Sequence, residues 1–254
     1  MRYLKLLFPA LLLSLSSLAQ GYLPGYVVTN NGDTLKGFVK YIRTENSPRV
    51  IRFKTDANAK VNKYSAADVK YFSIDIGYPL DFQRYSGPIS MDDIKIDNIT
   101  TLRDTSFKTD TVFFKILRKG KNITLYSYGD ALKTRFFVAD GHTEPTELIF
   151  RIYFKDNEFK LNHSSNTVNE ATYKKQLTVL AEKYGKADDG LMTDIANASY
   201  NEDNIEHIAD KINGYTGPDP AKGNQLARPP KTKLIIMVAA FAVAAYLTFS
   251  VMHH

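Results

Sequence analysis

The chain has 254 residues, of which 44% are hydrophobic and 24% charged, and its formal net charge is +6. This composition is that of a folded protein and excludes a disordered, collagen-like or coiled-coil chain. The chain contains no cysteine. That excludes disulfides, thiolate nucleophiles, cysteine-ligated zinc, iron–sulfur clusters and a lipid anchor on an acylated cysteine.

Residues 1–19 have the layout of a secretory signal peptide. Arg2 and Lys5 precede a short apolar run, and the small residues Ser17 and Ala19 take the −3 and −1 positions of a cleavage after Ala19. The apolar run is shorter than the roughly 20 residues that span a bilayer. The sequence therefore predicts export of the chain that follows.

Residues 20–158 are predicted to form an antiparallel β-rich domain, folded as a meander or in a barrel-like form. Two β-rich runs, 25–29 and 34–41, flank an Asn-Asn-Gly-Asp tip, which is a strong hairpin signal because Asn and Gly tolerate positive φ. Turn residues then recur too closely for a βαβ fold. Further strands are expected at 50–53, 69–74, 112–117, 123–128, 135–138 and 147–154.

Three parts of this domain carry more specific expectations. Residues 65–68 are predicted to form one helical turn. Residues 75–110, which contain Pro79, Gly87 and Pro88, are expected to be a loop with one or two short strands. The strand at 147–154 is expected to have a fully apolar face, made of Leu148, Phe150, Ile152 and Phe154.

Residues 159–216 are predicted to form a small helical subdomain, so the fold class is α+β. Thr167 and Glu170 have the capping-box spacing that begins a helix, and Gly185 is placed to end it. The apolar stripe of this helix is expected at Tyr173, Leu177, Leu180 and Tyr184. Two later helices are expected at 190–198 and at 202–213, with Gly214 ending the last one.

The C-terminal region predicts a linker and a membrane span. Residues 217–233 are rich in proline and basic residues, which is typical of an extended linker. Residues 234–252 carry no charge and are apolar on all sides, which indicates one transmembrane helix. By the positive-inside rule, the basic residues before the span favour a cytoplasmic location for the linker. The signal peptide predicts the opposite, because it would export the chain up to the span. We expect export, with a cytoplasmic tail-anchored protein as the interpretation if residues 1–19 are no signal peptide.

Motif searches predict no catalytic residue, no cofactor-binding residue and no metal site. The sequence has no phosphate loop, nucleophile elbow or dinucleotide fingerprint. The acidic patch of Asp92, Asp93 and Asp97 lacks the Gly and terminal Glu of a calcium loop and is expected to be a solvated loop. No metal-binding spacing joins the five histidines, which are His142, His163, His207, His253 and His254.

The basic charge does not indicate a nucleic-acid partner. The two ends of the chain, outside residues 20–217, contain six basic residues and one acidic residue. Residues 20–217 therefore have a net charge of only +1. The basic linker suits anionic lipid headgroups instead. Basic and aromatic residues interleave at 60–64 and 70–72, which we interpret as alternation between the solvent and core faces of strands.

Five stretches of the chain, taken together, carry a resemblance to a known family. They are 25–38, 113–128, Phe136-Phe137, Glu147-Leu148 and 173–177. Together they resemble an uncharacterised family of secreted envelope proteins from Bacteroidota. In that family the region often precedes an outer-membrane β-barrel, and the resemblance implies no catalytic residue. A single apolar helix is expected here instead, which favours the inner membrane, with outer-membrane association as the alternative.

The sequence thus predicts a non-enzymatic protein of the bacterial cell envelope. Its periplasmic domain would be anchored in the inner membrane by the C-terminal span and would bind or scaffold another envelope protein. The alternative is an envelope hydrolase that acts on glycan or peptide through Asp or Glu residues. A deep cleft with two carboxylates roughly 5–10 Å apart would favour the hydrolase, and a filled β core would favour the binding protein.

Overall fold

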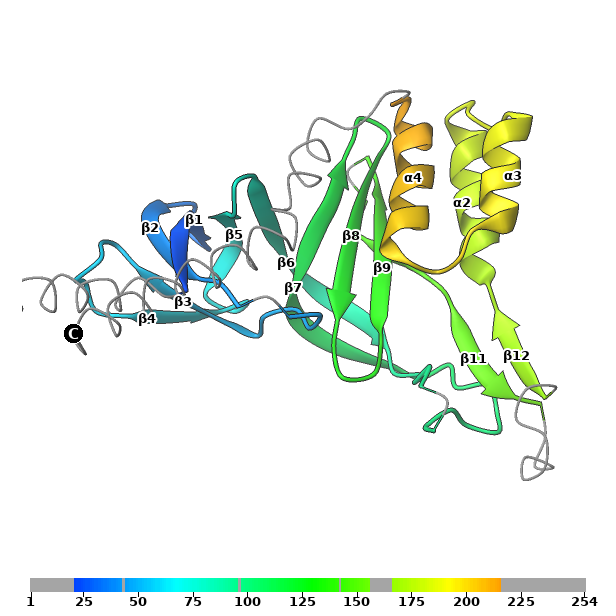
Figure 1. The fold of residues 1–254 in the computed structure, drawn as a ribbon, viewed down its shortest axis with the longest axis horizontal. Helices are drawn as coiled ribbons and strands as arrows, with labels where there is room; N and C mark the ends of the chain where they lie inside the picture. Colours follow the sequence, from blue (N-terminus) through cyan, green and yellow to red (C-terminus); the bar gives the residue numbers. More distant parts are fainter. Residues whose placement is uncertain (1–20, 43, 96, 142, 156–165, 216–254) are drawn as a thin grey trace, which may run out of the picture. The chain divides into compact units, whose positions relative to one another are not determined.

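The computed structural model describes residues 21–42, 44–95, 97–141, 143–155 and 166–215, all within one compact unit (Figure 1). These residues form a ten-stranded antiparallel sheet, a two-stranded sheet and three helices. The large sheet has β1 (Tyr22–Thr29), β2 (Thr34–Lys40), β3 (Val50–Lys54), β4 (Asn62–Ser65), β5 (Val69–Asp75), β6 (Pro79–Ser90), β7 (Phe107–Lys119), β8 (Ile123–Gly129), β9 (Thr134–Asp140) and β10 (Thr146–Leu148). The small sheet has β11 (Arg151–Phe154) and β12 (Thr167–Glu170), and the helices are α2 (Thr172–Lys183), α3 (Asp189–Asn197) and α4 (Glu202–Asn213).

The large sheet consists of two meanders that meet where β1 pairs with β5. Its order is β10-β9-β8-β7-β6-β5-β1-β2-β3-β4, so β1 to β4 and β5 to β10 each follow the chain. The predicted hairpin is present: Val28 faces Thr34 across the tip, where Gly32 has a φ of 99°. The prediction of antiparallel β-rich structure is confirmed. So are the strands expected at 50–53, 69–74, 112–117, 123–128 and 135–138.

Two expectations between β4 and β7 are wrong. Residues 65–68 form a turn and no helix, because the Asp68 carboxylate accepts hydrogen bonds from the backbone N–H and the hydroxyl of Ser65. The expected loop contains β6, a strand of 12 residues. Pro88 is tolerated in β6 because this end of the strand pairs only with β7, while β5 pairs with β6 only as far as Gln83.

The single strand expected at 147–154 is two strands. β10 ends at Leu148 and pairs with β9, whereas β11 begins at Arg151 and pairs with β12. The two residues between them carry the chain from one sheet to the other. The expected apolar face is therefore wrong: Arg151 is buried, while Phe150 and Ile152 are only half-buried.

The second and third predicted helices are confirmed, but the predicted start of the first helix is wrong. α3 and α4 lie as expected, and Gly214 ends α4 in the left-handed conformation with a φ of 81°. The predicted capping box, Thr167–Glu170, is instead the strand β12. The helix α2 begins at Thr172, after Ala171, which makes no side-chain capping bond. Glu170 does not cap the helix because arginine side chains bind its carboxylate.

The buried apolar side chains form three clusters. The first joins side chains of the three helices to side chains of β7–β10, and it includes Leu177, Ile205, Leu125 and Phe136. Figure 1 shows α4 beside β8 and β9. The second fills the inner face of β1–β3 and β5–β7. The third is an aromatic cluster on β6–β9, which includes Tyr85, Phe114, Tyr126, Tyr128 and Phe137. The helices thus complete one face of the second meander and hold its edge strand, β10, in place.

Several predicted segments lie outside the described residues. These are the signal peptide at 1–19, the linker at 217–233 and the membrane span at 234–252. Among the helices of the described ranges, none has the length and apolar character needed to cross a bilayer.

Candidate functional site

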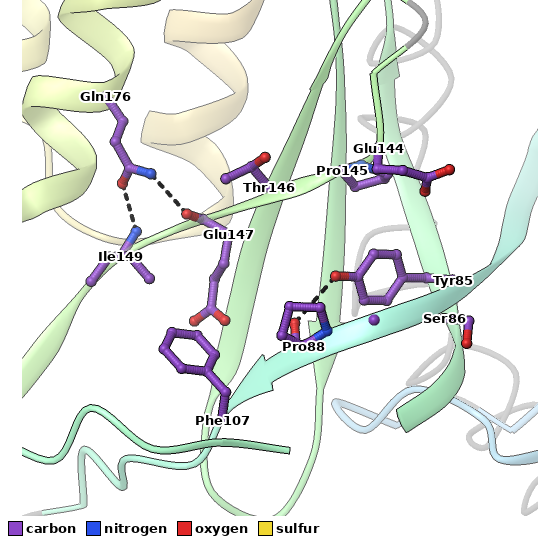
Figure 2. Close-up of a pocket in the computed structure, with 11 residues that line it drawn as sticks. Tyr85, Ser86, Pro88, Phe107, Glu144, Pro145, Thr146, Glu147, Ile149 and Gln176 are labelled. Carbon is purple, nitrogen blue, oxygen red and sulfur yellow. Dashed lines mark hydrogen bonds between the residues drawn. The ribbon is translucent and has the colours of Figure 1, made fainter. Parts of the chain in front are cut away.

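A groove of about 420 Å³ lies between β6, the start of β7 and the segment that contains β10 (Figure 2). This volume is within the range of about 300–1,000 Å³ that is typical of ligand pockets. Most of the groove's lining is apolar and comes from Tyr85, Pro88, Phe107, Pro145 and Ile149. The remaining lining residues are Ser86, Gly87, Glu144, Thr146, Glu147 and Gln176.

The β6 side of the groove is fixed by Tyr85. Its hydroxyl donates to the Pro88 carbonyl at 3.2 Å, and its ring stacks on Phe114 with centroids 4.2 Å apart. A Cβ on Gly87 would come within 2.5 Å of that hydroxyl, so this position requires glycine. Burial raises the pKa of Tyr85, and the nearby carboxylates of Glu147 and Glu144 raise it further. The hydroxyl therefore stays protonated and acts as a donor.

On the β10 side of the groove, the side chain of Gln176 occupies the backbone hydrogen-bonding groups at the sheet edge. Gln176 of α2 accepts a hydrogen bond from the Ile149 N–H at 2.8 Å and donates to the Glu147 carbonyl at 2.9 Å (Figure 2). A neighbouring strand would make the same two bonds. Open sheet edges pair with other chains, and Gln176 blocks that pairing here. The Ile149 N–H and the Glu147 carbonyl at this edge are thus already bonded within the protein.

Glu147 contributes a carboxylate to the groove lining, but that carboxylate is buried and already bound. Its Oε1 accepts the Ser90 hydroxyl at 2.6 Å and its Oε2 accepts the Ser90 N–H at 3.1 Å. The Lys133 ammonium lies 3.9 Å from Oε1. The charge of Glu147 is thus balanced inside the protein.

Lys133 belongs to a buried polar cluster that adjoins the groove. Its ammonium donates to the Asp92 carboxylate at 2.6 Å and to the Phe150 carbonyl at 3.0 Å. Burial lowers the pKa of Lys133, and the hydrogen bond to Asp92 opposes that shift. Burying an ammonium without such partners would be very costly. Lys133, which directly precedes β9, therefore ties the Asp92 loop to one of the two residues between β10 and β11.

Arg135 is the most deeply buried cation of the cluster, with no exposed surface. It donates to the Ser90 carbonyl from Nε at 2.9 Å and from Nη2 at 2.6 Å, and it pairs with Asp130 at 3.0 Å. Burial alone would raise the pKa of Asp130, but the hydrogen bond and charge of Arg135 lower it. Arg135 therefore fixes the end of β6, where Ser90 holds Glu147.

Glu170 extends the cluster to the small sheet. Its carboxylate accepts two hydrogen bonds of 2.7 Å from Arg103 and one of 3.3 Å from Arg151. The hydrogen bonds from Arg103 are the main reason why the pKa of Glu170 is lowered to about 2. Arg151 Nε lies 3.8 Å from Asp92 Oδ1, and neither atom has a hydrogen-bond partner among the described residues. Alternating charges thus connect the two sheets through Arg103, Glu170, Arg151, Asp92, Lys133 and Glu147.

The two glutamates of the groove do not converge. Figure 2 shows the Glu147 carboxylate turned toward Phe107 and the Glu144 carboxylate turned away from it. Acid–base hydrolysis of a glycosidic bond requires two carboxylates on either side of one reacting bond. The arrangement offers apolar contacts with a polar rim and holds its buried carboxylate in an internal network.

The acidic patch predicted from the sequence is split between the interior and the surface. Asp92 turns inward to Lys133 and is 4% exposed, so the expectation of a solvated loop is wrong for this residue. Asp93 accepts hydrogen bonds from the Lys95 N–H and from the Asn98 amide. Within the described ranges no group of three or more His, Asp or Glu residues could hold a metal ion.

Of the five histidines, His207 is the one that the structure describes. Its Nε2 lies 3.1 Å from the Asp194 carboxylate, which also binds Lys211. The hydrogen bond from Lys211 is the main cause of the lowered pKa of Asp194. Asp194 and His207 border a hollow of about 220 Å³, whose described lining contains no hydroxyl that could act as a nucleophile.

The interpretation of the basic–aromatic stretches as face alternation is confirmed on β4. Lys63 is exposed on β4, while the neighbouring Tyr64 turns inward, with its ring centroid 6.2 Å from that of Phe53. On β5 the alternation is interrupted: Lys70 is exposed and Phe72 is fully buried although they are two positions apart, because the register with β1 shifts here.

The buried charged cluster was not predicted from the sequence. Lys133, Arg135 and Arg151 each bind partners far away in the chain, and no local pattern marks such partners. One available signal was a charged residue next to or within an apolar strand, as at Arg135, which precedes Phe136-Phe137-Val138.

The resemblance to an envelope family of Bacteroidota stays a prediction, and a function is inferred here from the groove and its surroundings. No protein-family model, no curated protein and no solved structure matches the chain.

Proposed function

We propose that the protein is a non-enzymatic binding or scaffold protein of the bacterial cell envelope, whose groove receives apolar side chains of an envelope partner protein. The observation that carries this proposal is the state of Glu147. The groove is mainly apolar, and its buried carboxylate is bound to Ser90 and balanced by Lys133. An interface core has this character, since it is depleted in free charge and enriched in aromatic residues.

The rim of the groove supplies contacts for such a partner. Phe107 is 48% exposed, and large aromatic side chains often carry most of the binding energy of an interface. Ser86, Thr146 and Glu144 are exposed polar residues around it. Because Gln176 closes the edge of β10, the partner would bind through inserted side chains and hydrogen bonds at this rim.

The location that we propose rests on the sequence. A signal peptide at 1–19 and a span at 234–252 would place the domain in the periplasm, anchored in the inner membrane. The groove would then face other envelope proteins. No cofactor and no nucleic acid enters this proposal.

An envelope hydrolase is the competing proposal, because two glutamates line the groove. It would require Glu147 to leave Ser90 or to react while bound to it. The divergent directions of Glu144 and Glu147 in Figure 2 support the binding protein instead.

Site-specific photo-crosslinking in intact cells tests the proposal. The full chain would carry p-benzoylphenylalanine at position 107 in the groove or at position 179 on α2. Phe107 and Val179 are matched controls because they are 48% and 53% exposed. We expect a discrete protein adduct from position 107 and none of that mass from position 179.

Two results would contradict the proposal. One is the absence of any protein adduct from position 107 in folded, correctly located protein. The other is hydrolysis of envelope glycan or peptide by the purified chain that Glu144→Gln or Glu147→Gln abolishes without unfolding. The second result would establish the hydrolase.

A further inference from the structure

The first four strands carry charge of one sign only. Strands β1 to β4 contain no Asp and no Glu. Their charged residues are all basic, and they are Lys36, Lys40, Arg52, Lys54 and Lys63. The whole chain has nearly balanced charge outside its ends, so this separation is a local property of the sheet.

The strand register places these five residues on the same face. Phe38 pairs with Lys54, and side chains two positions apart share a face, so Lys36 and Lys40 lie beside Phe38 on that side. On the next pair of strands, Arg52 faces Lys63 directly. We call this surface, formed by Lys36, Lys40, Arg52, Lys54 and Lys63, the basic face.

The opposite face of the same strands is the protein core. Val39, Ile51 and Phe53 alternate with the basic residues and are at most 3% exposed. A one-residue slip in register would bury the cations, so the apolar core forces the basic face outward. Lys36, Arg52 and Lys63 are accordingly exposed.

The basic face lacks internal counter-charges. Among the residues that the structure describes, no carboxylate lies within ion-pair distance of any of its five cations. Lys54 donates to the Ala57 carbonyl and lies 4.8 Å from the centre of the Tyr22 ring. Arg52 and Lys63 are like charges directly opposite each other, an arrangement that destabilises a sheet. Anions from outside the protein would relieve this repulsion.

Aromatic side chains lie on the same side as the cations. Tyr22 pairs with Lys40 and Tyr26 pairs with Lys36, so these tyrosines lie on the same side of the sheet as the lysines. Tyrosine is enriched where proteins meet the headgroup layer of a bilayer, because its ring is apolar and its hydroxyl is polar. Lysine reaches headgroup phosphates with its charge while its stem stays along apolar surface.

We propose that the basic face binds a membrane surface rich in anionic phospholipid headgroups. Four of its five cations are lysines, which attract such a layer as mobile point charges and do not form the bidentate forks that read individual phosphates or bases. The proposal is consistent with a membrane-anchored domain, but it involves residues outside the groove and does not depend on the groove's partner.

Residue-resolved acetylation tests this proposal on the full-length chain. The protein would be incorporated into nanodiscs of phosphatidylcholine, with or without phosphatidylglycerol, and labelled with an amine-reactive reagent. The rates at Lys36, Lys40, Lys54 and Lys63 would be followed by mass spectrometry. Lys119 and Lys175, which are exposed and lie off this face, serve as internal controls.

We expect acetylation of the four lysines to slow about five-fold or more in phosphatidylglycerol discs, with the controls unchanged. The protection should vanish in about 1 M salt, where the Debye length is about 3 Å. The double variant Arg52→Gln/Lys63→Gln should reduce the protection of Lys36, Lys40 and Lys54.

Equal rates in the two kinds of disc would overturn the proposal. So would protection of Lys119 and Lys175 to the same extent, since that would indicate general shielding by the disc. A single-stranded oligonucleotide that protects the four lysines in detergent, where anionic discs do not, would instead assign the face to nucleic acid. None of these outcomes bears on crosslinking from position 107.

Discussion

Ser90 holds both carboxylate oxygens of Glu147, with its hydroxyl at 2.6 Å and its backbone N–H at 3.1 Å. The two residues are 57 positions apart in the chain and join the end of β6 to β10. Arg135 in turn binds the Ser90 carbonyl, so one serine connects the groove to the buried charges. This contact gives the groove a fixed wall and removes its buried carboxylate from solvent.

Glu147→Gln should therefore lower stability. The substitution removes a charge-assisted hydrogen bond and leaves Lys133 with less negative charge nearby, and we expect a loss of about 2–3 kcal/mol in the free energy of unfolding. Glu144→Gln, on the exposed rim, should change it by less than about 0.5 kcal/mol. Urea unfolding at pH 7 measures both, and equal effects of the two substitutions would contradict a structural role for Glu147.

Glu170 should make the protein sensitive to acid. Its pKa is lowered to about 2 in the folded protein, from an ordinary 4.5, chiefly by the hydrogen bonds from Arg103. Because the folded-state pKa lies below the unfolded one, this stabilisation is complete above pH 4.5 and is lost as the pH falls toward 2.

Glu170→Gln should be less stable than the wild type by about 2 kcal/mol at neutral pH. The gap between the two unfolding free energies should narrow as the pH falls below 4.5. Urea titrations at several pH values measure that gap. A gap that stays constant down to the lowest pH at which both proteins fold would show that Glu170 ionisation contributes nothing.

Gln176→Ala should expose the edge of β10. It removes two hydrogen bonds, to the Ile149 N–H and the Glu147 carbonyl, at a cost of about 1–2 kcal/mol. The freed edge should also promote association, because open edges pair with other strands. Size-exclusion chromatography with light scattering would detect it, with Lys175→Ala as the control. A monomeric variant of unchanged stability would mean that Gln176 does not close this edge.

Gly120 is required by the close approach of α4. A Cβ there would come within 2.0 Å of the Asn213 side chain, whose amide binds the N–H groups of Asn122 and Ile123 and the Ile123 carbonyl. Gly120→Ala should cost about 1–3 kcal/mol through overpacking. The cost should be smaller in an Asn213→Ala background, because the clash is gone. A double-mutant cycle that finds additive effects would contradict this contact.

Relieving the like-charge pair on the basic face should stabilise the isolated protein. Lys63→Glu places an acid opposite Arg52, and we expect a gain of about 0.2–1 kcal/mol in the free energy of unfolding. Lys119→Glu, on β7, is the matched control and has no such partner across the strand, since Lys119 faces Thr124. A loss of stability on Lys63→Glu would indicate that these cations have a folding role of their own.

Local signals in the sequence mark the starts of α3 and α4, the ends of α2 and α4 and the tip of the first hairpin. Asp188 and Asn201 accept capping hydrogen bonds from Leu191 and Asn204, three residues later, and Gly185 and Gly214 have positive φ just beyond their helices. These motifs act within a few residues, so a single sequence contains all the information. The alternation in β3 likewise places Ile51 and Phe53 in the core.

Contacts between residues far apart in the chain explain where prediction from the sequence fails. Thr167 and Glu170 have capping-box spacing, but Arg103, 67 positions away, binds the Glu170 carboxylate, and this segment is strand β12. The apolar pattern at 147–154 gives no sign of a break, because β10 and β11 pair with different sheets. The groove and its charged cluster arise from the same kind of long-range contact, so the sequence can mark a buried charge such as Arg135 but not what it binds.

The most direct test of the groove as a partner-binding site is to fill it with a bulky side chain and to photo-crosslink from its rim. With the crosslinker at position 107, Thr146→Arg should put a large charged side chain on the exposed rim of the groove and abolish the partner adduct. Thr55→Arg, an exposed threonine in the turn after β3, should leave the adduct unchanged. Equal adduct yields from the two variants, with both proteins folded, would contradict the groove as a binding site.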